Sequence, residues 1–160
     1  MSSKVYVQRL VLQKAKSIGK YKYYVELLKR WDLNPLLMEL EYGSDHLFLQ
    51  TCVEFWLRKK KWEILNINIS TGIPDLIVRD DDGNMIAIQV DTFELWKQGI
   101  AQAKRYVSDV TIHAGYVALP ATVCQREDLR KQIEKANLGL IEIFPDTHCK
   151  ITIPVKKMKY

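Results

Sequence analysis

The chain has 160 residues, the usual size of one globular domain, and its composition of 48% hydrophobic and 27% charged residues excludes wholesale disorder. The net charge of +5 is unevenly placed, because residues 1–62 carry 12 basic and 6 acidic side chains, a net of +6. Positive charge interleaved with Tyr and Trp suits a nucleic-acid backbone, but a solvated helical face accounts for it equally well.

No stretch reaches the roughly 18 consecutive apolar residues that a membrane span needs, so no membrane partner is expected. The first ten residues also lack the apolar core of a secretory signal. Three scattered cysteines, Cys52, Cys124 and Cys149, include no CxxC pair, which disfavours a zinc site or a disulfide framework. We therefore expect an intracellular, cytoplasmic protein.

A helical extension over residues 1–45 is expected to precede the core of the protein. Helices are predicted over residues 4–18 and 21–31, with a break at Gly19. Pro35 ends the second helix, because proline cannot continue the hydrogen-bond ladder and restricts the residue before it.

The core domain, residues 46–160, begins with a helix predicted over residues 46–61 from apolar residues at helical spacing. The helix ends in the basic run Arg58–Lys61, where positive charge complements the helix dipole. From Trp62 onward the pattern changes to alternating branched residues, which predicts a strand over 62–69 with an irregularity in its middle.

Alternating helical and strand patterns continue to the end of the chain. Strands are predicted over residues 73–79 and 85–90, joined by an acidic hairpin turn at 80–84. The remaining elements are a helix over 93–109, a strand over 114–119, a helix over 123–137 with Thr122 as its N-cap, a strand over 138–144 and an edge strand over 150–155. This order predicts an α/β fold of three layers.

Three oxygen-bearing side chains are expected to meet on the predicted hairpin. Asp75 begins one strand, Gln89 and Asp91 end its partner, and residues 75 and 89 are symmetric about the turn. Antiparallel pairing places them side by side, and residues two apart share a face of the sheet. Such oxygens suit Mg²⁺ or Mn²⁺, which would activate a water molecule and neutralise a phosphate oxygen. As alternatives, Asp75 caps a turn and Asp91 is the N-cap of the following helix.

These elements resemble the PD-(D/E)XK nuclease superfamily. Pro74-Asp75, the hairpin, Gln89-Val90-Asp91 and a helix with the sequence KQGIAQAKRY follow the layout of that superfamily. The αβββαβ order of residues 46–119 is also that of the restriction-endonuclease-like core. The resemblance implies a three-layer α/β/α core around a mixed sheet, and a Mg²⁺-dependent phosphodiester hydrolase that acts on DNA.

The resemblance also implies roles for individual residues. Asp75 matches the metal-binding acid, Gln89 stands where most members have Glu, and Asp91 stands where the family has Lys. That Lys is thought to orient the nucleophilic water, and a carboxylate cannot donate a proton in this way. Lys97 or Lys104 on the next helix would then replace it.

Two flanking helices supply the remaining candidates. Glu54 or Gln50 would provide the family's helical acid, because a spacing of four places both on one helix face with His46. Nucleic-acid contacts are expected from seven basic and amide side chains: Arg58, Lys59, Lys60, Lys61, Lys97, Gln102 and Arg105.

Three functions remain open from the sequence. The first is a metal-dependent DNA endonuclease with an atypical active site. The second is a catalytically silent module of the same fold that binds nucleic acid through Lys and Arg. The third is an assembly scaffold, for example in a homodimer.

Overall fold

The computed structural model describes residues 46–67, 75–91, 95–144 and 147–158. The predicted helical extension over residues 1–45 lies outside these ranges. The elements in chain order are α4 (His46–Lys60), β1 (Glu63–Ile67), β2 (Leu76–Arg79), β3 (Met85–Val90), α5 (Trp96–Val107), β4 (Ala114–Pro120), α6 (Ala121–Cys124), α7 (Glu127–Lys135), β5 (Gly139–Ile143) and β6 (Cys149–Ile153).

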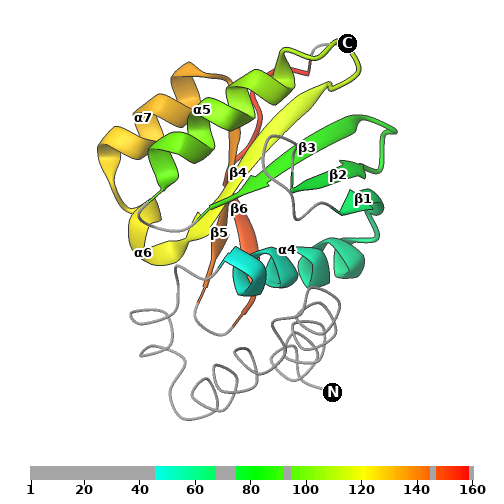
Figure 1. The fold of residues 1–160 in the computed structure, drawn as a ribbon, viewed down its shortest axis with the longest axis horizontal. Helices are drawn as coiled ribbons and strands as arrows, with labels where there is room; N and C mark the ends of the chain where they lie inside the picture. The colour runs from blue at the N-terminus through cyan, green and yellow to red at the C-terminus, as the bar shows by residue number, and fades with distance from the viewer. Residues whose placement is uncertain (1–45, 68–74, 92–94, 145–146, 159–160) are drawn as a thin grey trace.

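The strands form one mixed sheet in the order β1-β2-β3-β4-β5-β6. The pairs β1–β2, β2–β3 and β5–β6 are antiparallel, whereas β3, β4 and β5 run parallel. Helix α4 covers one face of the sheet, and α5 and α7 cover the other (Figure 1). The predicted three-layer α/β/α fold with a central mixed sheet is confirmed.

Two apolar cores hold the helices on the sheet. Under α4, Leu49, Val53 and Leu57 pack against the buried side chains of β2 and β3. Under α5 and α7, Trp96 and Ile100 pack against β4 and β5. Each fully buried aliphatic side chain contributes about 1.5–3 kcal/mol relative to exposure, so these cores orient the helices that surround the candidate site.

Strand β3 is buried on both faces and reads as an almost continuous apolar run. That pattern is typical of a strand between two helical layers. Gln89 is the polar residue of this run, and a buried polar side chain in such a place calls for hydrogen bonds.

The β2–β3 hairpin has the predicted register and turn. Leu76 pairs with Ile88, so continuing the pairing by one residue sets Asp75 opposite Gln89. In the turn, Asp80 Oδ1 accepts hydrogen bonds from the main-chain N–H groups of Asp82 and Asn84. Gly83 has a φ of +81°, a conformation that glycine adopts without steric cost.

Two other details of the sheet agree with the sequence patterns. The pairing of β1 with β2 shifts register between Ile64 and Asn66, which confirms the irregularity expected within residues 62–69. Strand β6 lies at the edge of the sheet, as predicted.

Two predicted helix caps are wrong. Helix α5 begins at Trp96 with Leu95 as its N-cap, so Asp91 lies four residues too early to cap it. Thr122 lies inside α6, and the predicted helix over 123–137 is two helices, because Arg126 is extended at φ −68° and ψ 125°. The Arg126 guanidinium bonds to the Asp128 carboxylate, which stabilises this break.

In the described part of the chain, no helix combines the length and the apolar character that crossing a bilayer requires.

Candidate active site

Asp75, Gln89 and Asp91 lie together on the face of the sheet covered by α5. All three are buried, with 5%, 6% and 7% of their surface exposed. Asp75 Oδ2 accepts a hydrogen bond from the Val90 N–H at 2.8 Å, and Gln89 Nε2 donates to Asp91 Oδ2 at 3.2 Å. The convergence expected from the hairpin is therefore present, and hydrogen bonds offset part of the cost of burying the polar groups.

The Gln89 amide has a defined orientation. Its Nε2 also donates to Gln102 Oε1 of α5, at 2.7 Å. Because Gln102 Oε1 and the Asp91 carboxylate oxygen are both acceptors, the NH₂ end of Gln89 must face them. Gln89 Oε1 is buried, and among the described residues it has no hydrogen-bond partner. A buried unsatisfied acceptor costs about 1–3 kcal/mol, and it is the kind of ligand that a hard cation takes.

Replacing Gln102 by leucine is expected to lower the free energy of unfolding by about 1–3 kcal/mol, since one Gln89 N–H loses its acceptor inside the protein. Urea unfolding would measure the change. The matched control is Gln98→Leu, at an exposed position of the same helix. Equal stability of the two variants would contradict the proposed support of Gln89 by Gln102.

Asp91 packs directly against helix α5. A Cβ added at Gly99 would overlap the Asp91 carboxylate, so a larger residue at this position would require the Asp91 side chain to move. The main-chain N–H of Asp91 donates to the Ala118 carbonyl at 3.1 Å, which continues the β3–β4 pairing past the strand. Asp91 is thus held where it accepts a hydrogen bond from Gln89, a role opposite to that of a donating lysine.

Tyr106 belongs to the same environment, although the sequence patterns did not single it out. It follows Gln102 by one helical turn and is half-buried. Burial raises the pKa of Tyr106 above its usual value of 10.0, and the charges of Asp75 and Asp91 raise it further, while Arg105 opposes them. The hydroxyl is therefore a neutral donor at physiological pH. Its spacing of four from Gln102 is the signal that could have identified it.

The raised pKa of Tyr106 predicts a pH dependence of stability. The folded protein holds this proton more tightly than the unfolded chain, so the contribution is complete below about pH 10 and is lost as the pH rises through the folded pKa. The tyrosinate absorbance of the wild type minus that of Tyr106→Phe would follow the titration. Asp75→Asn is expected to lower the pKa; an unchanged titration would show that Asp75 is too distant to act on Tyr106.

Lys97 and Lys104 lie on α5, the helix that also carries Gln102. Successive helical residues rotate by about 100°, so Lys104 projects about 200° from Gln102. Lys104 is exposed, and Lys97 Nζ lies 5.5 Å from the centre of the Trp96 ring. The replacement of the missing lysine by Lys97 or Lys104 therefore stays a prediction.

Helix α4 reaches the site from the other face of the sheet. Gln50, completely buried, donates from Nε2 to the main-chain carbonyl of Asp75 at 3.5 Å. Glu54 is also buried on α4. In the described ranges, however, no three acidic, histidine or cysteine side chains form a group that could hold a metal, so Glu54 does not complete a cluster with Asp75 and Asp91.

The residues predicted to contact nucleic acid lie in separate parts of the structure. Arg58–Lys60 are exposed at the end of α4, about 12–15 Å along the helix axis from Gln50. Lys61 follows them, also exposed, and Arg105 is exposed on α5 beside Tyr106. Gln102 is occupied with Gln89 and therefore supports the site from within.

Comparisons with known proteins add little to this geometry. No protein-family model matches the chain, and neither does any curated protein. Among solved structures, a complex of EndoMS with double-stranded DNA is similar, with a TM-score of 0.39 and 20% sequence identity. The similarity covers 52% of this chain and 37% of that chain, so the chain spans just over a third of the EndoMS chain. A likeness at this level assigns no activity.

Proposed function

We propose that the protein is a metal-dependent phosphodiester hydrolase that acts on DNA through Asp75, Gln89 and Asp91. The observation that carries the proposal is the buried Gln89 Oε1, which has no hydrogen-bond partner among the described residues and belongs to a side chain that bonds to Asp91 and lies opposite Asp75 in the hairpin. A buried acceptor in this setting fits a hard cation with oxygen ligands.

Asp75 and the amide oxygen of Gln89 would hold Mg²⁺ or Mn²⁺, with Asp91 as a further candidate; Glu54 forms no metal-holding group with these carboxylates in the described part of the chain. The bound metal would polarise a phosphate oxygen and lower the pKa of a water molecule. Asp91 and Gln102 orient the Gln89 amide, because each accepts a hydrogen bond from its NH₂ group. Tyr106, protonated and half-buried, is suited to donate a hydrogen bond to a phosphate oxygen.

The proposal of DNA as substrate is supported by the order of secondary-structure elements and by charge. The αβββαβ order and the PD and Gln-x-Asp segments resemble those of the PD-(D/E)XK nucleases. Lys97, Lys104 and Arg105 are exposed on α5, the helix that covers the candidate site, and would add affinity for phosphates.

A catalytically silent DNA-binding module is the alternative, and one observation favours it. Asp91, which stands where the family has Lys, accepts a hydrogen bond and cannot orient a water by donation. A site built in this way could retain a metal and nucleic acid without hydrolysing the phosphodiester bond.

Incubation with plasmid and linear DNA separates the two functions. In Mg²⁺ or Mn²⁺ we expect cleavage that disappears in EDTA and in Asp75→Ala. If DNA affinity falls steeply with salt but no cleavage occurs, the silent module is correct. Absence of both cleavage and affinity would overturn both functions and favour a scaffold, whose oligomeric state sedimentation would give.

The paired substitution Gln89→Glu with Asp91→Lys tests whether the missing lysine limits activity. Cleavage should increase in the double variant, because the introduced ammonium group can donate to a water and to the introduced carboxylate. Thermal unfolding would check that the longer side chain is accommodated beside Gly99.

A further inference from the structure

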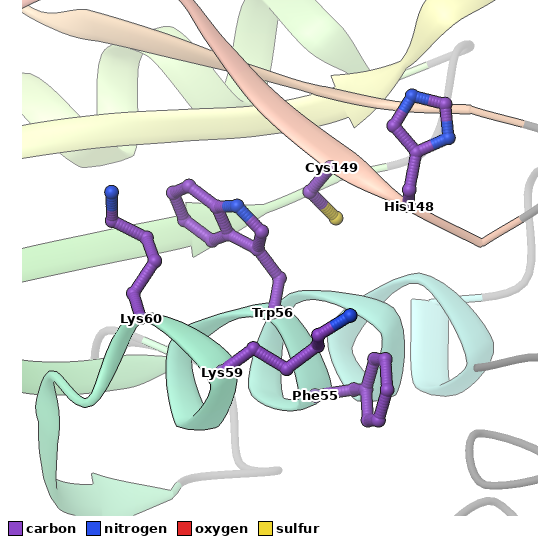
Figure 2. A pocket seen from close by; sticks show the side chains of 6 residues that line it. All are labelled: Phe55, Trp56, Lys59, Lys60, His148 and Cys149. Atoms are coloured by element: carbon purple, nitrogen blue, oxygen red, sulfur yellow. The ribbon is translucent and has the colours of Figure 1, made fainter. Parts of the chain in front are cut away.

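A cavity of about 330 Å³ opens between helix α4 and the start of β6. Its volume lies within the range of small-ligand sites. Among the described residues, six line it: Phe55, Trp56, Lys59, Lys60, His148 and Cys149 (Figure 2). It lies on the face of the sheet covered by α4, whereas the candidate active site lies under α5. Strand β6 is three strands from β3, a separation of about 14 Å.

The cavity combines cationic groups with aromatic faces. Lys60 Nζ lies 5.2 Å from the Trp56 ring centre, and Lys59 Nζ lies 5.5 Å from the Phe55 ring centre. Figure 2 shows the Trp56 indole between Lys60 and Cys149. None of the described lining residues is acidic. Such a surface attracts a ligand that has both negative charge and a flat ring.

The Trp56 ring packs against other aromatic rings that fix its position. Its centre lies 6.1 Å from that of Trp62, whose centre in turn lies 6.5 Å from that of buried Tyr116. Lys60 Nζ also lies 5.1 Å from the Trp62 ring centre. Trp56 itself is half-buried, so it keeps accessible surface beside the cavity. A ring positioned in this way offers a stacking surface without a large ordering cost on binding.

We propose that this cavity binds a nucleotide unit, with the base stacked on Trp56 and the phosphate paired with Lys59 and Lys60. The nucleotide would be either a mononucleotide or an unpaired residue of a nucleic-acid strand. This site is separate from Asp75, Gln89 and Asp91, so it does not depend on whether the protein hydrolyses DNA.

The test measures binding of fluorescently labelled oligo(dT) in EDTA, where metal-dependent hydrolysis cannot occur. Lys59→Ala with Lys60→Ala is compared with Arg58→Ala with Lys61→Ala, which removes the same charge from residues that do not line the cavity. The first pair should weaken binding several-fold more than the second. Equal losses in the two pairs, or no binding by the wild type, would overturn the proposal.

Substitutions at Trp56 test the stacking part of the proposed site. Trp56→Leu is expected to weaken oligo(dT) binding at least about tenfold, as for loss of one stacked base, whereas Trp56→Phe should keep most of the affinity. An oligomer of abasic residues should bind the wild type about as weakly as oligo(dT) binds Trp56→Leu. If the affinity is unchanged by removal of the bases and by Trp56→Leu, the stacking site is refuted.

Competition distinguishes the two sources of the nucleotide. Displacement of oligo(dT) by thymidine monophosphate at similar concentrations identifies a mononucleotide site, whereas displacement by unlabelled single strands alone identifies a strand-binding site. Either result supports the proposal only when the Lys59/Lys60 pair and Trp56 govern the affinity. Thermal unfolding of each variant identifies losses that come from misfolding, and Trp56→Phe then decides the role of the ring.

Discussion

Replacing Asp75 by asparagine is expected to reduce metal-dependent DNA cleavage at least about 100-fold while leaving the fold intact. The asparagine oxygen can still accept the hydrogen bond that the Val90 N–H now gives to Asp75 Oδ2. The substitution therefore removes the negative charge that would bind the metal and keeps this hydrogen bond. Rates of plasmid cleavage in Mg²⁺, with urea unfolding in parallel, would measure both effects.

Asp75→Ala should behave differently in one respect. It leaves the Val90 N–H without its acceptor in a buried place, which costs about 1–3 kcal/mol of stability in addition to the lost activity. Asp82→Asn, in the exposed turn of the same hairpin, is the matched control and should change neither quantity. Full activity of Asp75→Asn would refute the assignment of Asp75 as a metal ligand.

Gly99→Ala is expected to destabilise the protein, by about 1–3 kcal/mol, although a glycine-to-alanine change inside a helix ordinarily stabilises by about 1 kcal/mol. The reason is the overlap of the new Cβ with the Asp91 carboxylate, which is buried and bonded to Gln89. Displacement of Asp91 would also release the Gln89 amide, so DNA cleavage should fall together with the free energy of unfolding.

A double-mutant cycle isolates this contact. In an Asp91→Ala background the carboxylate is absent, and Gly99→Ala should then be neutral or stabilising. The difference between the two backgrounds, measured by urea unfolding, gives the coupling between helix α5 and Asp91. Identical effects in both backgrounds would show that the cost arises elsewhere in the helix.

Local patterns in the sequence were sufficient to predict the hairpin that carries the candidate site. The turn at residues 80–84 has a carboxylate that bonds to its own backbone and a glycine with positive φ, so it sets the register without help from other elements. Alternation along β2 and β3 then places Asp75 opposite Gln89 and on the same face as Asp91. Both the convergence and its face follow from interactions within about 16 residues.

Helix ends were harder to predict, because competing interactions decide them. The alternative in which Asp91 caps α5 is wrong, because close packing against Gly99 and a hydrogen bond from Gln89 occupy its carboxylate. Thr122 was expected to begin a long helix, but Arg126 breaks it and bonds to Asp128. A capping side chain identifies a helix start only when no tertiary contact engages it first.

The sequence by itself determined the three-layer class, the strand pairing around the turn and the meeting of three polar side chains. Only the tertiary structure decided which end of the Gln89 amide faces Gln102, which flank of α5 carries Tyr106, and that α4 and β6 enclose a cavity with aromatic and basic walls. The physical reason is the separation along the chain over which each kind of interaction acts. Turn and strand geometry act over a few bonds, whereas the rotation of a helix about its axis is set by the apolar surface it buries against distant strands.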